Sequence, residues 1–213
     1  MLNCAEELIL LAIDDVSNSF HKITININVA LIGALLMDLA LQKRICVTPE
    51  NIRILSTEKT DDKFLNEILE ILNDFGTNCE PVALFSQLYN QRCNLKTKLL
   101  QDLEDKGIIK VNESKVLWLF KQRHYPVVDQ KEEEEVLFRL RKIVLTDVEP
   151  EPRDLALIAL LKICGLLNKI FTDEELQQRK ERFIQLKQMD EISPAVNKII
   201  GEMQVLITTS YTT

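Results

Sequence analysis

The side chains able to do acid–base or nucleophilic chemistry are few and scattered along this chain. It contains only two histidines, His21 and His124, and its five cysteines lie far apart, with no Cys-x-x-Cys pair. A Cys–His catalytic pair would need one of these thiols to meet a histidine in space, whereas reduced thiols packed in a core explain the spacing more simply. No glycine-rich phosphate loop, Gly-x-Ser-x-Gly elbow or His-Glu-x-x-His motif occurs. We therefore expect no catalytic residues, no metal ligands and no cofactor.

Carboxylates come in adjacent pairs, at 6–7, 14–15 and 61–62, and in a run at 132–135. Neighbouring residues of a helix point about 100° apart, so the pairs are predicted to serve solvation and capping rather than to act as acid/base dyads. The run is predicted to form the solvated first turn of a helix. An enzyme would require a cleft in which titratable groups have opposite, strong pKa shifts.

Composition predicts one domain over residues 1–213. The chain has 213 residues, of which 46% are hydrophobic, and only 5 glycines and 6 prolines, which favours helices over tight turns. Its longest apolar run, 29–41, has 13 residues, fewer than the roughly 20 that cross a bilayer. Glu6 and Glu7 precede the first apolar stretch, where a signal peptide would carry basic residues. We expect a cytoplasmic protein with reduced cysteines.

The hydrophobic pattern predicts a mostly α-helical fold with small β-hairpins. Helical periodicity is found at 5–13, 29–43, 61–73, 81–90, 95–105, 132–145, 153–168, 173–188 and 194–207. Two of these helices feed predicted hairpins, with strands at 45–48 and 52–56 and at 108–111 and 115–120. Each helix with its hairpin resembles a winged-helix unit. The predicted architecture is thus a single compact helical domain with two such units.

Five segments, in order, resemble the Golgi phosphoprotein 3 family, also called GPP34. They are EELILL at 6–11, LIGALLMDLALQKRI at 31–45, DKGII at 105–109, Tyr125-Pro126-Val127, and RDLALIAL at 153–160. The resemblance implies a peripheral membrane protein that is not an enzyme. It further implies an adaptor that, in eukaryotic members, reads phosphatidylinositol 4-phosphate on Golgi membranes and retains glycosyltransferases by their cytosolic tails. In the family the second hairpin makes oligomer and membrane contacts, which here assigns that role to Trp118, Leu119 and Phe120.

The resemblance also implies a lipid headgroup pocket built from one tryptophan and three arginines. Matching Gly33 places Ile32 at the first arginine position and either His21 or Ile23 at the tryptophan, and matching 105–107 places Cys93 and Lys96 at the two later arginines. A headgroup site in this chain would thus be remodelled, from His21, Lys22, Arg92 and Lys96. Such a divergent pocket suggests a bacterial-type member.

Two other classes of function are compatible with a helical protein of this kind: nucleic-acid binding and protein interaction without a lipid. A winged-helix nucleic-acid-binding protein needs a basic recognition helix, but 29–41 has no basic residue, 95–105 has two lysines against three acids, and the net charge is −7. No nucleic acid is therefore expected. A protein-interaction module without a lipid ligand is a further alternative.

The expected partners are an anionic lipid headgroup, cytosolic tails of membrane proteins and a second copy of the chain bound through the second hairpin. The expected location is the cytoplasm, peripheral at a membrane, with the Golgi implied only in a eukaryote.

Overall fold

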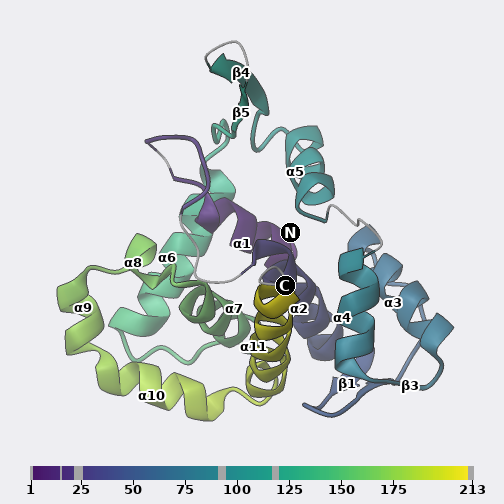
Figure 1. Cartoon of the computed structure of the whole chain (residues 1–213). Coiled ribbons are helices and arrows are strands. Elements are labelled where there is room, and N and C mark those ends of the chain that lie inside the picture. The colour runs from purple at the N-terminus through teal and green to yellow at the C-terminus, as the bar shows by residue number, and fades with distance from the viewer. Residues whose placement is uncertain (1, 15, 22–25, 91–94, 117–119, 211–213) are drawn as a thin grey trace.

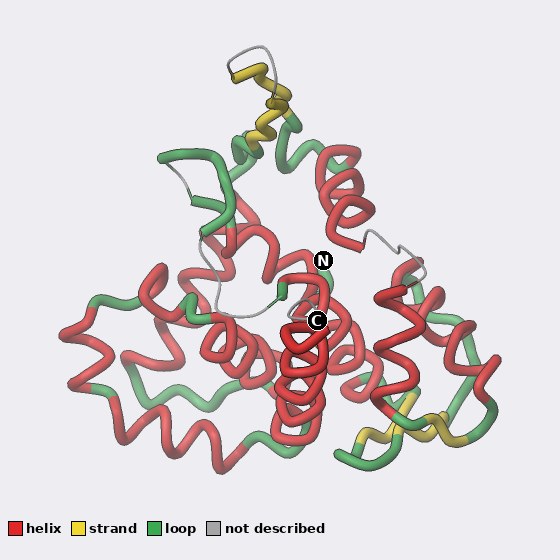
Figure 2. The backbone as a smooth tube through the Cα atoms, in the orientation of Figure 1, coloured by secondary structure: helices red, strands yellow, loops and turns green. Residues whose placement is uncertain are grey.

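The computed structural model describes residues 2–14, 16–21, 26–90, 95–116 and 120–210, and in this part helices dominate, as predicted (Figures 1 and 2). The helices are α1 (Cys4–Ala12), α2 (Ile27–Leu41), α3 (Lys63–Phe75), α4 (Pro81–Asn90), α5 (Leu95–Asp105), α6 (Lys131–Leu145), α7 (Pro152–Cys164), α8 (Leu167–Ile170), α9 (Asp173–Gln178), α10 (Lys180–Met189) and α11 (Ser193–Ser210). The strands are β1 (Ile45–Val47), β2 (Ile52–Ile54), β3 (Asn78–Cys79), β4 (Asn112–Val116) and β5 (Phe120–His124).

The central element is α2, which packs against α1, α3, α4, α5, α7 and α11. Its residues from Val29 to Leu39 are all buried, including Asp38. The Asp38 carboxylate accepts a hydrogen bond of 2.7 Å from the backbone N–H of Cys4, at the positive end of the α1 dipole. Burial raises the pKa of Asp38 above its ordinary value. Because α2 lies inside the protein, it cannot serve as a recognition helix in a nucleic-acid groove.

Gly33 lets α2 and α11 approach closely. A Cβ atom at this position would lie 2.4 Å from Cδ1 of Ile200 and 3.3 Å from Cγ1 of Val196. We expect Gly33→Ala to lower the free energy of unfolding by about 1 to 3 kcal/mol, because the cost of overpacking exceeds the gain in helix propensity. Urea unfolding followed by circular dichroism would measure this change. Gly201→Ala is the matched control, since a Cβ there meets nothing within 4 Å, and it should be neutral or stabilising. Equal effects of the two substitutions would contradict the prediction.

Two predicted helices are each divided in the structure. The helix predicted over 153–168 ends at Cys164, because Gly165 adopts a left-handed conformation (φ 72°, ψ 27°), and the short α8 follows. The helix predicted over 173–188 is broken at Arg179 (φ −101°, ψ 16°), which separates α9 from α10. The guanidinium of Arg179 donates to the carbonyl of Leu145 at the end of α6, so this break is fixed by a contact distant in sequence.

The first predicted hairpin is confirmed and carries an additional strand. Strand β1 pairs antiparallel with β2, with Ile45 opposite Ile54 and Val47 opposite Ile52. The two-residue strand β3 then pairs with the other edge of β2. Two residues are too few to produce an alternating hydrophobic pattern, so the sequence did not predict β3.

The second hairpin is shifted from its predicted position. The predicted strand 108–111 lies before the hairpin, because Ile108 and Ile109 are buried in the core, and the predicted turn at 112–114 belongs to β4. Strand β4 pairs antiparallel with β5, and Glu113 and Arg123 form a cross-strand ion pair of 2.9 Å. The hairpin projects from the helical body (Figures 1 and 2). Trp118 and Leu119 lie outside the described residues, and only the backbone of Phe120 is described, so the oligomer and membrane contacts assigned to these residues stay predictions.

Candidate functional site at the turn between α1 and α2

A tight turn reverses the chain directly after α1. The carboxylate of Asp14 accepts a hydrogen bond of 2.7 Å from the N–H of Ser17, and the Asp14 carbonyl accepts one of 2.8 Å from the N–H of Asn18. Asn18 supplies the left-handed conformation (φ 51°) that the turn needs. Phe20 then pairs with Ile13 in an antiparallel bridge. Val16 in this turn is 92% exposed, the largest exposure among the big apolar side chains described.

Three segments distant in sequence meet at Phe20. Its ring packs edge to face against Tyr125, at the end of the β4–β5 hairpin, with ring centroids 5.3 Å apart. The N–H of Tyr125 donates to the carbonyl of Asn18 at 2.6 Å, which fastens the turn to the hairpin. The ammonium of Lys96, in the first turn of α5, lies 3.5 Å from the centroid of the Phe20 ring. The turn, the hairpin and α5 thus share one surface, which we call the turn surface: residues 14, 16–21, 96 and 123–125.

Among its described residues, the turn surface carries cationic and titratable groups beside the carboxylate of Asp14. Lys96 is half-buried, and this burial lowers the pKa of its ammonium. His21 Nε2 lies 3.5 Å from an oxygen of Asp14. Hydrogen bonds from Ser17 hold the pKa of Asp14 below its usual range, so it remains an anion next to His21. His124 Nδ1 lies 3.1 Å from the carbonyl oxygen of Ser17, so both histidines of the chain flank the same turn.

Of the four predicted headgroup residues, the structure describes two. It brings the segment that holds His21 against Lys96 through the Phe20 ring. Lys22 and Arg92 lie outside the described residues. Phe20 and Tyr125 were not predicted as site residues, although Tyr125 stands in one of the segments that carry the family resemblance, and an aromatic next to His21 was a usable signal.

A buried ion-pair network holds α5 against α1. The ammonium of Lys106 lies 2.6 Å from Oε1 of Glu6 and 2.8 Å from Oδ2 of Asp102, and Lys63 of α3 also donates to Asp102. Burial raises the pKa of Glu6. Burial also opposes ionisation of Asp102, but the ammoniums of Lys106 and Lys63 outweigh it and lower the pKa of Asp102 to about 2.

The pKa values of Glu6 and Asp102 are shifted in opposite directions, as in the acid–base pair of an enzyme. The geometry nevertheless indicates a structural role. Asp102 lines an open groove of about 560 Å³ between α3 and α5, which Glu6 does not line. Both oxygens of Glu6 are engaged, Oε1 by Lys106 and Oε2 by the N–H of Asn3 at 3.0 Å in the capping box of α1. Networks of this kind perturb pKa values without catalysis.

A second network joins α1 to α6 and α7. Arg139 lies 3.1 Å from Oε1 of Glu7 and 2.5 Å from Oδ1 of Asp154, and Arg153 lies 3.3 Å from the same oxygen of Glu7. The predicted solvation of Glu6 and Glu7 is therefore wrong, because both are buried by tertiary ion pairs, whereas the predicted capping is confirmed for Glu6 in the capping box of α1. The predicted solvated run 132–135 is wrong at one position for the same reason, since the buried Glu133 pairs with Lys169 at 2.7 Å.

The described cysteines are packed in the protein and do not have the properties of reactive thiols. Cys4, Cys79 and Cys164 are buried free thiols, as predicted, and Cys46 is partly buried. Burial raises the pKa of Cys164 to about 12, far from the range of a reactive thiolate.

Comparison with known proteins identifies the family of this chain. A family model described as Golgi phosphoprotein 3 (GPP34) matches residues 4–203. The chain belongs to the GPP34 family. Among its relatives, this GPP34 protein is 23% identical to vacuolar protein sorting-associated protein 74 of Eremothecium gossypii, over 88% of this chain and 67% of that protein. In the part of the GPP34 chain that the structure describes, no helix is both long and apolar enough to cross a membrane.

One position of the implied GPP34 pocket can be located within the core. Ile32, which the resemblance places at an arginine of the headgroup pocket, is 3% exposed in α2. An arginine there would have to leave the core to reach a headgroup in water. In this GPP34 chain the described residue Lys96 instead places a cation against the turn segment, with its ammonium over the Phe20 ring.

Proposed function

We propose that this protein is a non-enzymatic adaptor that binds membranes peripherally through its turn surface, with an anionic lipid headgroup as the ligand. The observation that carries the proposal is the position of the Lys96 ammonium, 3.5 Å from the centroid of the ring of Phe20, the residue that precedes His21. Phosphatidylinositol 4-phosphate is the first candidate headgroup, because eukaryotic members of the resembled family bind it. Residues Lys22 and Arg92 complete the proposed cationic set. Binding of cytosolic tails would follow from the adaptor role.

The exposed Val16 supports a membrane ligand over a soluble anion. An apolar side chain that is 92% exposed in a turn gains free energy by entering the interfacial region of a bilayer. Hydrogen bonds of Asp14, Asn18 and Tyr125 fasten the described residues of the turn to one another and to the hairpin. An exposed apolar side chain in a turn next to the ammonium of Lys96 is suited to docking onto an anionic surface.

Liposome flotation at low ionic strength tests the proposal. Vesicles of neutral lipid, of neutral lipid with a simple anionic lipid, and of neutral lipid with phosphatidylinositol 4-phosphate would be compared. We expect selective flotation with the phosphoinositide, and a roughly tenfold loss of affinity in Lys96→Met, which keeps the apolar stem and removes the charge-assisted contact. Adding Arg92→Gln should weaken binding further, and Val16→Asp should weaken binding to every anionic vesicle.

Lys180→Met is the matched control, since Lys180 is an exposed lysine of α10, an element separate from the turn surface. It should float like the wild type. Loss of the cation–π contact in Lys96→Met should cost less than about 1 kcal/mol of stability, so folding can be checked independently. If no vesicle floats the wild type, the lipid role is wrong, and a protein-interaction module without a lipid ligand becomes the better hypothesis.

A further inference from the structure

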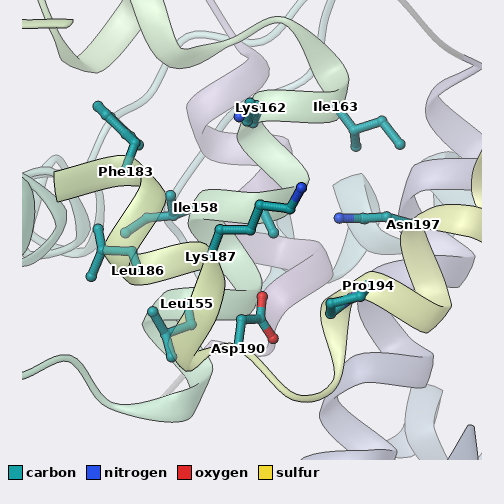
Figure 3. Close-up of a pocket in the computed structure, with 11 residues that line it drawn as sticks. Leu155, Ile158, Lys162, Ile163, Phe183, Leu186, Lys187, Asp190, Pro194 and Asn197 are labelled. Carbon is teal, nitrogen blue, oxygen red and sulfur yellow. The ribbon is translucent and has the colours of Figure 1, made fainter. Parts of the chain in front are cut away.

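A pocket of about 520 Å³ lies between α7, α10 and α11. Figure 1 places α10 on the side of the molecule opposite the β4–β5 hairpin, so the pocket is separate from the turn surface. Its walls are mostly apolar, formed by Leu155, Ile158, Ala159, Ile163, Phe183 and Leu186 (Figure 3). A pocket of this volume and lining is typical of a small-molecule site.

The pocket is held open by the way α10 is fixed at both ends. Arg182 donates to the carbonyls of Ile143, at 3.2 Å, and Val148, at 2.5 Å, and so fastens the first turn of α10 to the end of α6. At the other end, the carboxylate of Asp190 accepts hydrogen bonds from the N–H groups of Ile192 and Ser193, which sets the direction in which α11 starts. The pocket is therefore pre-formed, which lowers the entropy cost of binding.

The polar groups of the lining are arranged asymmetrically. Lys162 and Lys187 are exposed and have no ion-pair partner within the described residues. In Figure 3 the ammonium of Lys187 points away from Asp190, toward the side of the pocket where Lys162 and Asn197 lie, and the side-chain nitrogen of Asn197 points inward. The buried side-chain oxygen of Asn197 has no hydrogen-bond partner among the described groups. One end of the pocket thus offers the ammoniums of Lys162 and Lys187 and the amide nitrogen of Asn197. The rest of the lining is mostly apolar, with the carboxylate of Asp190 away from the ammonium of Lys187.

We propose that this pocket binds a single-chain amphiphile with an acidic head, such as a medium-chain fatty acid. The hydrocarbon chain would contact Leu155, Ile158 and Leu186, and the carboxylate would lie at the end where Lys162, Lys187 and Asn197 donate. A cationic amphiphile would place its charge against two lysines, and a neutral one would leave the donors unused. This inference is independent of the proposed headgroup function, because the two sites share no residue.

Isothermal titration of the full chain with octanoate, decanoate and dodecanoate, below their micelle concentrations, tests the proposal. Affinity should rise by up to about fourfold per added methylene until the pocket is full. Decylamine and decanol should bind at least tenfold more weakly than decanoate. Equal affinity for decanoate and decylamine, or no dependence on chain length, would overturn the proposal.

Two variants locate the site. Ala159→Phe should abolish decanoate binding by filling the pocket, and the double substitution Lys162→Gln, Lys187→Gln should weaken decanoate about tenfold while leaving decanol unchanged. The control is Lys142→Gln, Lys180→Gln, which removes two exposed lysines of α6 and α10 outside the lining. Because the lysines of both pairs are exposed, their substitution should not impair folding. The two double variants therefore still test the proposal if Ala159→Phe does not fold. Wild-type affinity in the Lys162, Lys187 double variant would contradict the proposed head position.

Discussion

Arg139→Met is expected to lower the free energy of unfolding by about 4 kcal/mol, the largest effect that we predict. Arg139 is the group that bridges Glu7 of α1 and Asp154 of α7, and both carboxylates are buried. Removing one partner of a buried ion pair leaves an uncompensated charge, which costs about 3 to 5 kcal/mol. Arg153 remains near Glu7, at 3.3 Å, so Asp154 should account for most of the loss.

Urea unfolding at pH 7 would measure this change. Arg123→Met is the matched control, because Arg123 also pairs with a glutamate, Glu113, but at the exposed hairpin. It should cost less than about 1 kcal/mol. Arg139→Lys should rescue only part of the stability, since a lysine cannot contact both carboxylates with the fixed fork of a guanidinium. Similar losses in Arg139→Met and Arg123→Met would show that the buried network is not the source of stability that we infer.

Lys106→Met is expected to lower the free energy of unfolding by about 3 kcal/mol at pH 7. The substitution leaves Glu6, whose side chain is 1% exposed, without its cation. It also removes one of the ammonium groups that contact the carboxylate of Asp102. Lys110→Met removes an exposed lysine two residues before the start of β4 and should be close to neutral. The double variant Glu6→Gln, Lys106→Met should be more stable than Lys106→Met alone, because glutamine keeps a capping oxygen and carries no charge.

The pH dependence of this effect follows from the directions of the two pKa shifts. Asp102 has a pKa of about 2, below its ordinary 3.8, so its stabilising contribution is present above about pH 4 and is lost as the pH falls toward 2. The pKa of Glu6 is raised above 4.5, so its contribution falls as the pH rises through the folded-state pKa. Without Lys106 the pKa values of both carboxylates rise. The stability lost in Lys106→Met should therefore be larger at pH 7 than at pH 4, and a penalty independent of pH would refute this assignment.

The helices could be predicted from sequence where local pattern decides them. Helices α4 and α5 have the predicted bounds. The prediction failed where a tertiary contact decides. The break at Arg179 depends on a carbonyl of α6, and the position of the β4–β5 hairpin depends on Ile108 and Ile109 being held in the core, which outweighs the turn propensity of the polar residues that follow.

The site could be predicted only in part, for a similar reason. His21 and Lys96 came from the family resemblance, whereas their connection through Phe20 and Tyr125 joins residues that are up to 105 positions apart. Periodicity does not report such contacts. The same limit explains why adjacent glutamates were interpreted as solvated, since the residues that neutralise them, Lys106 and Arg139, lie on other helices.

The ion pairs of α1 have one more consequence, for the rotation of this helix about its own axis. Every residue from Cys4 to Ala12 is buried, so the apolar side chains alone define no preferred face. Glu6 and Glu7 point about 100° apart, one toward Lys106 and the other toward Arg139. A helix turned by one residue would leave one of the two cations opposite Ala5 or Leu8 and one carboxylate without its partner. The two carboxylates thus select a single orientation of α1 among several that hydrophobic packing would tolerate. They thereby set the direction in which the chain leaves α1 and enters the turn.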